Sequence, residues 1–203
     1  MIFFWLMTGY LFGSLPFGYI LFRLAKGDDI RKYGSGNIGA TNIGRMMGNS
    51  WAVLVAMGDL FKGGIAVILA YLLGFNDPWI ISMTGLAAVL GHNFPIWLNF
   101  QGGKGVSTTF GVVIFFIPPV SFIVASVGGL IWLFTLKIFR YVSIASLLSL
   151  FSLPLAFYVA GSDRAFIIIS LLLACISCFQ HRSNISRIIK GTEMKAGNKE
   201  DRH

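Results

Sequence analysis

Long apolar segments, separated by short polar ones, make up most of the chain. Seven of them have few or no charged residues: residues 2–22, 51–73, 79–98, 106–117, 120–136, 141–160 and 165–180. A helix that crosses a membrane needs about 17–25 mostly apolar residues. The pattern therefore predicts an all-α, polytopic membrane protein with seven transmembrane helices.

The boundary between the fourth and fifth segments has two interpretations. Residues 106–117 form a short segment that Pro118-Pro119 separates from the fifth, and one long span across both is the alternative. Lys and Arg concentrate in cytoplasmic loops. Seven spans with the N-terminus outside place 14 of the 16 basic residues in the cytoplasm, whereas a merged span moves Lys137 and Arg140 outside. Seven spans, with an external N-terminus and a cytoplasmic C-terminus, fit the charges better.

The composition agrees with a membrane protein. The chain of 203 residues is 56% hydrophobic and 12% charged, and its mean hydropathy is +0.76. These values exclude an ordinary soluble domain and a disordered chain. The N-terminus lacks a basic start and a cleavage site, so we expect the first span to be retained. Residues 1–190 are predicted to form one membrane domain, and residues 191–203 a solvated cytoplasmic tail.

Small polar residues are concentrated on one predicted face of the membrane. Three segments carry them, GSGNIGATNIGR (34–45), GHNFPIWLNFQGGKGVSTTFG (91–111) and HRSNISRIIKGTE (181–193). The outer loops contain little beyond FNDP and GSDR. A protein that only packed helices together would not need this asymmetry, so the cytoplasmic face is the candidate site.

The first segment has the chemistry of an anion-binding loop. It begins with a match to G-x-G-x-x-G, but that dinucleotide fingerprint requires a preceding strand in a βαβ unit, which is not predicted here. Gly34, Gly36 and Gly39 have no Cβ and can adopt positive φ, so their backbone N–H groups can approach a ligand closely. Successive N–H groups form an anion nest. Arg45 adds a full positive charge.

The second segment contains QGGKGVSTT, which is similar to a P-loop without matching it. Lys104 is followed by Gly105 instead of Ser or Thr, and position 98 is not glycine. The segment still combines flexible backbone and one lysine with hydroxyl side chains at 107–109 that open a helix. Two such loops on one face predict two anionic groups, or one group shared between them.

The third segment offers His181 and Asn184, which share a face of a helix because they are spaced i, i+3. The sequence supports a catalytic role and an interfacial role for His181 about equally. Cys175 and Cys178 form an isolated C-x-x-C in an apolar run, and we interpret them as buried small hydrophobes instead of a metal or redox site.

Two further groups of residues have a structural and a functional interpretation. Asp59 and Lys62 lie in the second span at i, i+3 spacing, typical of a structural ion pair, although charges inside a membrane are functional candidates by default. We interpret His92 and Pro95 first as packing and kink residues. Glycines 63, 64, 128 and 129 are predicted to allow close helix packing.

These motifs, in this order and at these separations, resemble the PlsY family of bacterial membrane acyltransferases, which acylate glycerol 3-phosphate with acyl-phosphate. The segments 34–45, 91–105 and 181–193 are similar to its three motifs, and RYVSIAS (140–146) and DLFKG in the second span also match. The likeness runs from the first span to about Glu193. It departs at Ser183, where the family has an acidic residue, and in a longer tail.

The resemblance implies a seven-helix enzyme of the bacterial inner membrane with a cytoplasmic site, without cofactor or metal. The implied partners are glycerol 3-phosphate, acyl-phosphate, membrane lipids and the soluble enzyme that makes acyl-phosphate, but no nucleic acid. Glu193 is implied to be structural. The implied catalytic residues are Ser35, Arg45, Lys104, His181 and Asn184. The implied substrate-binding residues are Gly36, Asn37, Gly39, Ala40, Thr41, Asn42, Gly102, Gly103, Gly105 and Ser143.

Alternatives from other classes are an anion transporter and a purely structural membrane subunit. Transporters usually show repeats and broken helices at the bilayer midplane, and a structural subunit leaves the polar loops unexplained. The H-x-x-x-x-D motif of other glycerolipid acyltransferases is absent, because Trp97 lies five residues after His92 and Ser186 five after His181. The base is therefore either His181 or a phosphate oxygen of the substrate, and we favour the substrate.

Overall fold

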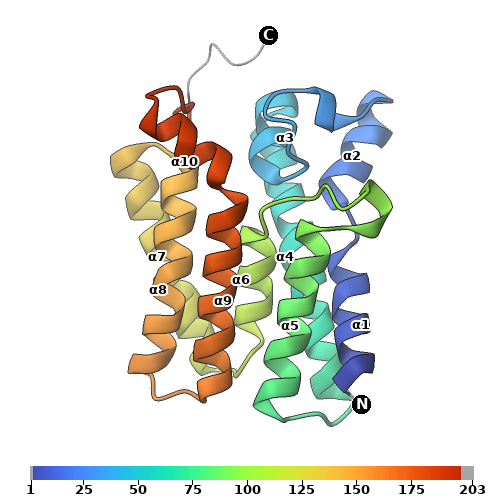
Figure 1. Ribbon diagram of the computed structural model, residues 1–203, viewed down its shortest axis with the longest axis vertical. Coiled ribbons are helices and arrows are strands. Elements are labelled where there is room, and N and C mark those ends of the chain that lie inside the picture. The colour runs from blue at the N-terminus through green and yellow to red at the C-terminus, as the bar shows by residue number, and fades with distance from the viewer. Residues whose placement is uncertain (1, 198–203) are drawn as a thin grey trace.

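The computed structural model describes residues 2–197, and within that range the regular secondary structure is entirely helical (Figure 1). In this described part of the chain, ten α-helices and two short 3₁₀ helices follow one another. Their bounds are α1 Ile2–Gly13, α2 Phe17–Lys26, η1 Ile30–Lys32, α3 Ala40–Met47, α4 Asn49–Leu72, α5 Pro78–Asn93, η2 Ile96–Leu98, α6 Val106–Ile114, α7 Val120–Phe139, α8 Val142–Val159, α9 Arg164–Gln180 and α10 Arg182–Ile189.

Within residues 2–197, five helical segments are long and apolar enough to cross a membrane. They are Ile2–Lys26 (α1 with α2), Asn49–Leu72, Pro78–Leu98, Val120–Phe139 and Val142–Val159. A sixth is obtained if α9 and α10, which are bent by 57° relative to one another, are taken together. The predicted all-α membrane architecture is confirmed to this extent. The count of seven spans and the orientation of the termini stay predictions.

Helix α6 is the element that differs most from an ordinary span. It has nine residues, which at 1.5 Å per residue is about 14 Å, roughly half of the hydrocarbon core. The chain reverses direction after it, so α6 and α7 run antiparallel and do not form one long span (Figure 1). The segment 94–105, which precedes α6, crosses the bundle below the level of α3 and α10 (Figure 1).

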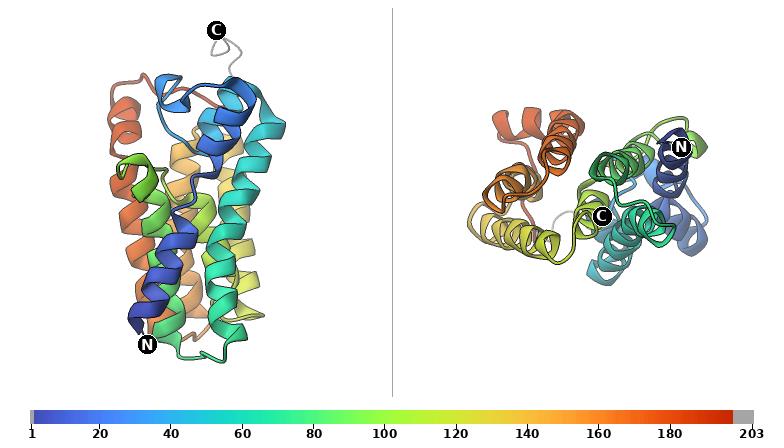
Figure 2. Two further views of the ribbon diagram at one scale, coloured as in Figure 1. Left: turned by 90° about the vertical axis from the view of Figure 1, so that its right-hand side faces the viewer. Right: turned by 90° about the horizontal axis from the view of Figure 1, so that it is seen from below.

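The helices form two groups with α6 between them (Figure 2). One group holds α1, α4 and α5, and the other holds α7, α8 and α9; α6 contacts α4, α5, α7 and α9. The three polar motifs gather at one end of this bundle, and the N-terminus lies at the other (Figure 2).

Glycines allow the helices around α6 to approach closely. A Cβ on Gly63 would lie 2.6 Å from the carbonyl oxygen of Thr108, and one on Gly64 would lie 2.9 Å from the ring of Phe115. A Cβ on Gly128 would lie 2.7 Å from Leu153. The predicted packing role holds for these three glycines. It is wrong for Gly129, which has no neighbour within 4 Å.

The interior and the outer surface of the bundle are both apolar. The space between α6, α8 and α9 is filled by three rings that are tilted relative to one another, Phe116, Phe157 and Phe166, with centroids 5.2–6.1 Å apart. Helix α7 exposes a row of large apolar side chains, as expected of a lipid-facing surface. Cys175 is exposed and Cys178 half-buried. The prediction that both cysteines are buried is therefore wrong, because they lie toward the outer surface of α9, beside exposed leucines.

Candidate functional site

A cavity of about 330 Å³ joins the three polar motifs. Sequence-predicted site residues from the first two motifs lie in its wall, namely Ser35, Asn37, Gly102, Gly103 and Lys104. The rest of the wall is Asn93, Phe94, Phe100, Gln101, Gln180, Arg182, Ser183 and Arg187. The structure thus brings together segments that are up to about 150 residues apart in the sequence.

The first loop is shaped by two glycines and one asparagine. Gly34 and Gly36 adopt φ of 56° and 71°, the left-handed region that favours glycine. The buried amide of Asn42 holds the loop closed: its Nδ2 donates to the carbonyl oxygens of Tyr33 (3.0 Å) and Asn37 (2.9 Å), and its Oδ1 accepts from Ser35 N (3.0 Å). Asn42, predicted to bind substrate, here shapes the loop that presents Ser35.

Two of the helices that begin at this end, α3 and α6, follow a glycine of the predicted motifs and have no side-chain cap. Gly39 precedes α3, whose first turn contains Ala40 and Thr41, and Gly105 precedes α6. The first N–H groups of a helix have no partner within the helix, and they attract anions together with the helix dipole. Both helix starts are therefore suited to an anionic ligand, as predicted for the glycine-rich loops.

The second loop is fastened to the end of α5. Gly102 N donates to the carbonyl oxygen of Asn93 (3.1 Å), and Gly103 N donates to that of His92 (3.1 Å). Gln180 Nε2 donates to the carbonyl oxygen of Gly103 from α9 (3.3 Å). A Cβ on Gly102 would lie 2.6 Å from the Asn93 carbonyl oxygen. Glycine is needed here because the loop lies directly against the backbone of α5.

Lys104 connects the second loop to the third motif. Its ammonium group donates to Oδ1 of Asn184 on α10. Asn184 Nδ2 donates to Oε1 of Glu193 (2.6 Å), and Arg187 Nε donates to Oε2 of the same carboxylate (2.7 Å). Ser143 Oγ donates to Glu193 Oε1 (3.2 Å). Ser143, predicted to bind substrate, therefore lies behind Asn184 and outside the cavity wall.

Burial and neighbouring charges tune this network. Burial lowers the pKa of Lys104 to about 8; the Glu193 carboxylate opposes this shift, and the charges of Arg187 and Arg45 add to it. For Glu193, burial alone would raise the pKa, but hydrogen bonds from Asn184 and Arg187 outweigh it and lower the pKa below its ordinary value. Lys104 is thus an ammonium at neutral pH, and Glu193 is its nearby counter-charge.

His181 follows the last residue of α9 and is buried, with 3% of its surface exposed. Its Nδ1 lies 2.8 Å from the carbonyl oxygen of Ser177. A carbonyl oxygen only accepts, so Nδ1 carries the proton and Nε2 is left with a free lone pair. Burial, followed by the charge of Lys104, lowers the pKa of His181 to about 4. His181 is therefore a neutral imidazole with a fixed tautomer.

Arg45, predicted to be catalytic, faces a second cavity of about 450 Å³. Its wall combines two basic side chains with apolar ones and contains Ala25, Lys26, Arg45, Met46, Met47, Gly48 and Trp51. Arg45 is near enough to Lys104 for its charge to act on the pKa of that residue. The structure thus places Arg45 beside the first cavity, but not in its wall.

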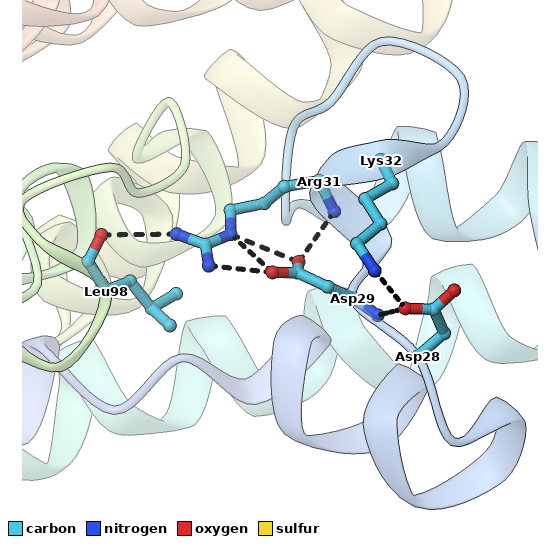
Figure 3. Close-up of polar contacts among 5 residues, drawn as sticks. All are labelled: Asp28, Asp29, Arg31, Lys32 and Leu98. Carbon is cyan, nitrogen blue, oxygen red and sulfur yellow. Dashed lines mark hydrogen bonds and ion pairs between the residues drawn. The ribbon is translucent and has the colours of Figure 1, made fainter.

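An ion pair just before the first loop also connects this part of the chain to η2, which precedes the second loop (Figure 3). Arg31 contacts the Asp29 carboxylate through Nε (3.1 Å) and Nη2 (2.7 Å). Its Nη1 donates to the carbonyl oxygen of Leu98 in η2 (3.3 Å). The adjacent Lys32 pairs with Asp28 at 2.8 Å. From the sequence, Arg31 was interpreted only as one of the cytoplasmic charges.

Asn93 and Gln180 also line the cavity, although neither was singled out from the sequence. Asn93 is 1% exposed, and neither atom of its side-chain amide has a hydrogen-bond partner among residues 2–197. A buried amide without a partner costs about 1–3 kcal/mol. Asn93 lies in the second motif beside His92. In the sequence, an amide side chain close to a glycine-rich loop is the signal that could have identified it.

The fold and the cavity define an α-helical membrane protein with a site suited to a phosphate-bearing ligand. The protein family described as "Glycerol-3-phosphate acyltransferase" matches residues 3–191. This chain therefore belongs to the glycerol-3-phosphate acyltransferase family.

Relatives and solved structures agree over nearly the full length. The glycerol-3-phosphate acyltransferase of Desulforudis audaxviator is 42% identical, covering 92% of this chain and 91% of its own; that of Halalkalibacterium halodurans is 40% identical, covering 97% of both. Among solved structures, PlsY (YgiH), an integral membrane glycerol 3-phosphate acyltransferase, in its glycerol 3-phosphate form has a TM-score of 0.88 at 38% identity, covering 97% of this chain and 96% of its own. Its lysophosphatidic acid form has a TM-score of 0.85 at 36% identity, covering 97% and 95%.

Proposed function

We propose that this protein transfers a fatty acyl group from acyl-phosphate to glycerol 3-phosphate, giving lysophosphatidic acid (1-acylglycerol 3-phosphate) and inorganic phosphate, the first acylation of phospholipid synthesis. The observation that carries the proposal is the cavity in which Lys104 lies beside the uncapped start of α6, with the first loop opposite. Both substrates present a phosphate to such a site. The solved relative in its glycerol 3-phosphate and lysophosphatidic acid forms supports the same pair of substrate and product.

The chemistry requires little beyond orientation and charge neutralisation. The primary hydroxyl oxygen of glycerol 3-phosphate attacks the acyl carbonyl carbon, a new ester C–O bond forms, and the bond to the phosphate oxygen breaks with the electron pair leaving on phosphate. In our assignment, Lys104, His181 and Asn184 hold glycerol 3-phosphate, while Ser35 and Arg45 orient the phosphates. Fixed cations and N–H groups lower the barrier because they are in place before charge develops.

The proton of the attacking hydroxyl goes to a phosphate oxygen of a substrate. A base works best when its pKa lies near the operating pH, and a phosphate monoester has its second pKa near 6. His181, with a pKa of about 4, is much the weaker base of the two. Its free Nε2 lone pair suits it instead to accept a hydrogen bond from a substrate hydroxyl.

The donor is acyl-phosphate rather than acyl-CoA. A cavity of about 330 Å³ with a compact cationic group favours a small phosphate headgroup over a nucleotide. The acyl chain of the donor extends into the bilayer, which gives a physical reason for a phosphate site in a membrane protein. Membrane lipids and the soluble enzyme that produces acyl-phosphate are the corresponding partners.

In the bacterial inner membrane, we place the N-terminus outside and both the C-terminus and the three motifs in the cytoplasm. Loop 94–105 lies below α3 and α10, so it can complete the crossing that the nine residues of α6 begin (Figure 1). The asymmetry of 14 basic residues supports this orientation. Seven spans result, with residues 1–190 as one membrane domain and 191–203 as a tail.

We also assign Asn93 to the substrate site, as a residue that contacts the glycerol moiety of glycerol 3-phosphate. Lys104 and the helix starts suit the phosphate, whereas a hydroxyl group can both donate and accept hydrogen bonds. The unpartnered amide of Asn93 offers both in the cavity wall. Asn93→Ala is expected to lower kcat/KM for glycerol 3-phosphate more than for 3-hydroxypropyl phosphate, which lacks the second hydroxyl.

The direct test is turnover by the purified protein in detergent. We expect lysophosphatidic acid when acyl-phosphate and glycerol 3-phosphate are both present, and much less when palmitoyl-CoA replaces palmitoyl-phosphate. Lysophosphatidic acid is measured by mass spectrometry and phosphate release by a colorimetric assay, in a one-to-one ratio. Equal turnover with palmitoyl-CoA would refute the donor assignment. Phosphate uptake into proteoliposomes without any acyl transfer would instead support the transporter alternative.

A further inference from the structure

A charged cluster that the proposed chemistry does not use lies inside the bundle, directly beneath the second loop. Asp59 and Lys62 come from α4 and His92 from α5, and each is at most 4% exposed. Lys62 Nζ lies 2.7 Å from Asp59 Oδ1, 2.8 Å from His92 Nδ1 and 2.7 Å from the carbonyl oxygen of Leu15. His92 Nδ1 is also 3.4 Å from Asp59 Oδ1. All three side chains lie within candidate membrane spans.

These distances fix the tautomer of His92. A lysine ammonium has three N–H donors and no acceptor. Lys62 donates to the carbonyl oxygen of Leu15, forms an ion pair with Asp59 and contacts Nδ1 of His92, so Nδ1 must be the accepting nitrogen. The ring proton of neutral His92 is therefore on Nε2, at the opposite side of the ring. Lys62 thus determines both the orientation and the tautomer of the imidazole.

The opposite side of that ring lies against Gly103 of the second loop. A Cβ on Gly103 would come within 2.7 Å of His92 Cε1 and 3.0 Å of Cδ2, with Nε2 nearer still. The three nearest atoms to that Cβ all belong to His92. Gly103 is not among the glycines with positive φ. The ring of His92, and not the backbone conformation, therefore excludes a side chain at position 103.

His92 also holds the loop through its backbone. Its carbonyl oxygen accepts from Gly103 N, and the carbonyl oxygen of Asn93 accepts from Gly102 N. The residue before Lys104 is thus held from two directions by one histidine, whose ring is in turn held by Lys62. The position of the second loop therefore depends on the charged cluster.

An ion pair inside a membrane has a cost that packing alone does not explain. Replacing a buried ion pair by apolar residues of similar volume is often neutral or stabilising, and charges in a bilayer are expensive. Leu at position 59 and Met at position 62 would be compatible with α4 as a membrane helix. The polar trio is therefore expected to serve the loop that it contacts.

We propose that Asp59, Lys62 and His92 are positioning residues that hold Gly103 and Lys104 in the conformation that binds the phosphate of glycerol 3-phosphate. The inference rests on the proposed function of the second loop as the phosphate site. Asp59 neutralises Lys62, Lys62 holds the His92 ring, and the ring supports Gly103. None of the three touches substrate.

The test is a double-mutant cycle between the ring and the loop. His92→Ala is expected to raise KM for glycerol 3-phosphate at least about tenfold and to change kcat by less than about threefold, since a positioning residue acts through binding. Gly103→Ala is expected to raise KM at least about hundredfold because its Cβ meets the ring. In the double variant the ring is gone, so KM should fall back to within about threefold of His92→Ala alone.

Gly105→Ala is the matched control on the same loop. Gly105 has φ of 77° and a Cβ there would lie 2.7 Å from Asn93 Oδ1, so its defect does not depend on His92. His92→Ala should therefore rescue Gly103→Ala and leave Gly105→Ala unrescued. Rescue of both, or of neither, overturns the proposal.

The charged pair is tested with Asp59→Leu/Lys62→Met, which removes both charges together and leaves no lone buried ion. It should reproduce the KM defect of His92→Ala, and an unchanged KM would overturn the role of the pair.

Size-exclusion profiles and melting temperatures establish that the variants fold. If His92→Ala does not fold, it is replaced by His92→Asn, which keeps an acceptor for Lys62. The shift in melting temperature that glycerol 3-phosphate produces reports binding without turnover. If the wild type is inactive, the same cycle is measured through these melting-temperature shifts, and the same pattern of rescue would then refute the acyl transfer but not the positioning role.

Discussion

The ammonium group of Lys104 and the side-chain amide of Asn184 are joined by a hydrogen bond across 80 residues of sequence. The bond fixes the amide of Asn184: Oδ1 accepts from Lys104, and Nδ2 donates to Glu193. The cation at the end of the second loop is thereby attached to helix α10. The second and third motifs act as one unit, and a change in either is expected to be felt in the other.

Lys104→Met should abolish most of the activity, while Lys137→Met should change it by less than about twofold. Lys104 is the ammonium group in the cavity wall, and removing one preorganised charge from an acyl-transfer site costs on the order of 10²–10³ in rate. Lys137 lies in the last turn of α7 and outside the cavity wall. Lysophosphatidic acid formation measures both variants, and comparable losses would contradict the assignment of Lys104.

The pKa of Lys104 predicts an alkaline limit of activity. Burial lowers this pKa to about 8, so the binding-competent ammonium is present at pH 7 and is lost as the pH rises through about 8. The value of kcat/KM should therefore fall above pH 8, because this parameter reports the free enzyme. Bound phosphate favours the ammonium, so kcat should fall only at higher pH.

Lys104→Arg provides the control for the alkaline limit. The guanidinium stays charged to above pH 12, so whatever activity the variant retains should lack the fall near pH 8. An identical alkaline limb in wild type and Lys104→Arg would show that another group titrates there.

His181→Gln should lose activity only in part, mainly through a higher KM for glycerol 3-phosphate. The imidazole is neutral and donates a hydrogen bond from Nδ1 to the carbonyl oxygen of Ser177. Its Nε2 is therefore a hydrogen-bond acceptor, a role that the glutamine carbonyl can share. The midpoint of the pH–rate profile near neutrality should survive, because it belongs to the substrate phosphate. Loss of turnover at saturating substrate, or loss of that midpoint, would make His181 the base.

Glu193→Ala should destabilise the protein. The carboxylate accepts from Asn184, Arg187 and Ser143, and removing it leaves a buried amide and a cation without their acceptor. The expected loss is about 2 kcal/mol, which in a chain of this size lowers the melting temperature by roughly 4–8 °C. Glu193→Gln keeps the shape and one acceptor and should lose less.

The same carboxylate gives a pH dependence of stability. The pKa of Glu193 is below its ordinary value of 4.5, so its contribution is present above about pH 4.5 and is lost as the pH falls through the folded-state pKa. The difference in melting temperature between wild type and Glu193→Gln should therefore narrow in acid. A constant difference down to pH 3 would contradict this account.

The proposed topology predicts which exposed positions react from the cytoplasm. With Cys175 and Cys178 replaced by Ser, single cysteines at Ser35, Gln101 and Ser183 should be labelled by an impermeant maleimide only in inside-out vesicles. A cysteine at Asn76, at the opposite end of the bundle, is the matched control and should be labelled only in right-side-out vesicles. Labelling of any motif position from outside would refute the model of seven spans with an external N-terminus.

Most of the fold could be predicted because apolar runs of membrane length leave few alternatives. The predicted ranges 51–73 and 141–160 correspond to α4 and α8 within two residues. The short α6 could be located, but its nine residues are too few to cross a membrane alone, and the sequence does not show how the preceding loop packs. Which side of α9 faces lipid could not be predicted either, since an evenly apolar helix carries no signal for its exposed face.

The three loops of the candidate site were predicted separately, but the contacts between them were not predicted. Residue type and spacing identified Lys104 and Asn184 as polar groups, but their hydrogen bond depends on packing between α5, α9 and α10. Ser143 was assigned to the substrate by resemblance, whereas its hydroxyl is bonded to Glu193. Arg31 was counted only as a charge, because nothing in the sequence shows that the carbonyl oxygen of Leu98 lies within its reach.

The i, i+3 ion pair of Asp59 and Lys62 has a consequence for how the protein enters the membrane. Each isolated charge at the centre of an inserting helix costs about 2.5–3.5 kcal/mol. Because both partners lie on α4, 2.7 Å apart, the pair can form as soon as that helix is made and does not have to wait for α5. Helix α4 thus carries its own counter-ion into the bilayer during biogenesis, and His92 joins the pair only when the hairpin of α4 and α5 closes.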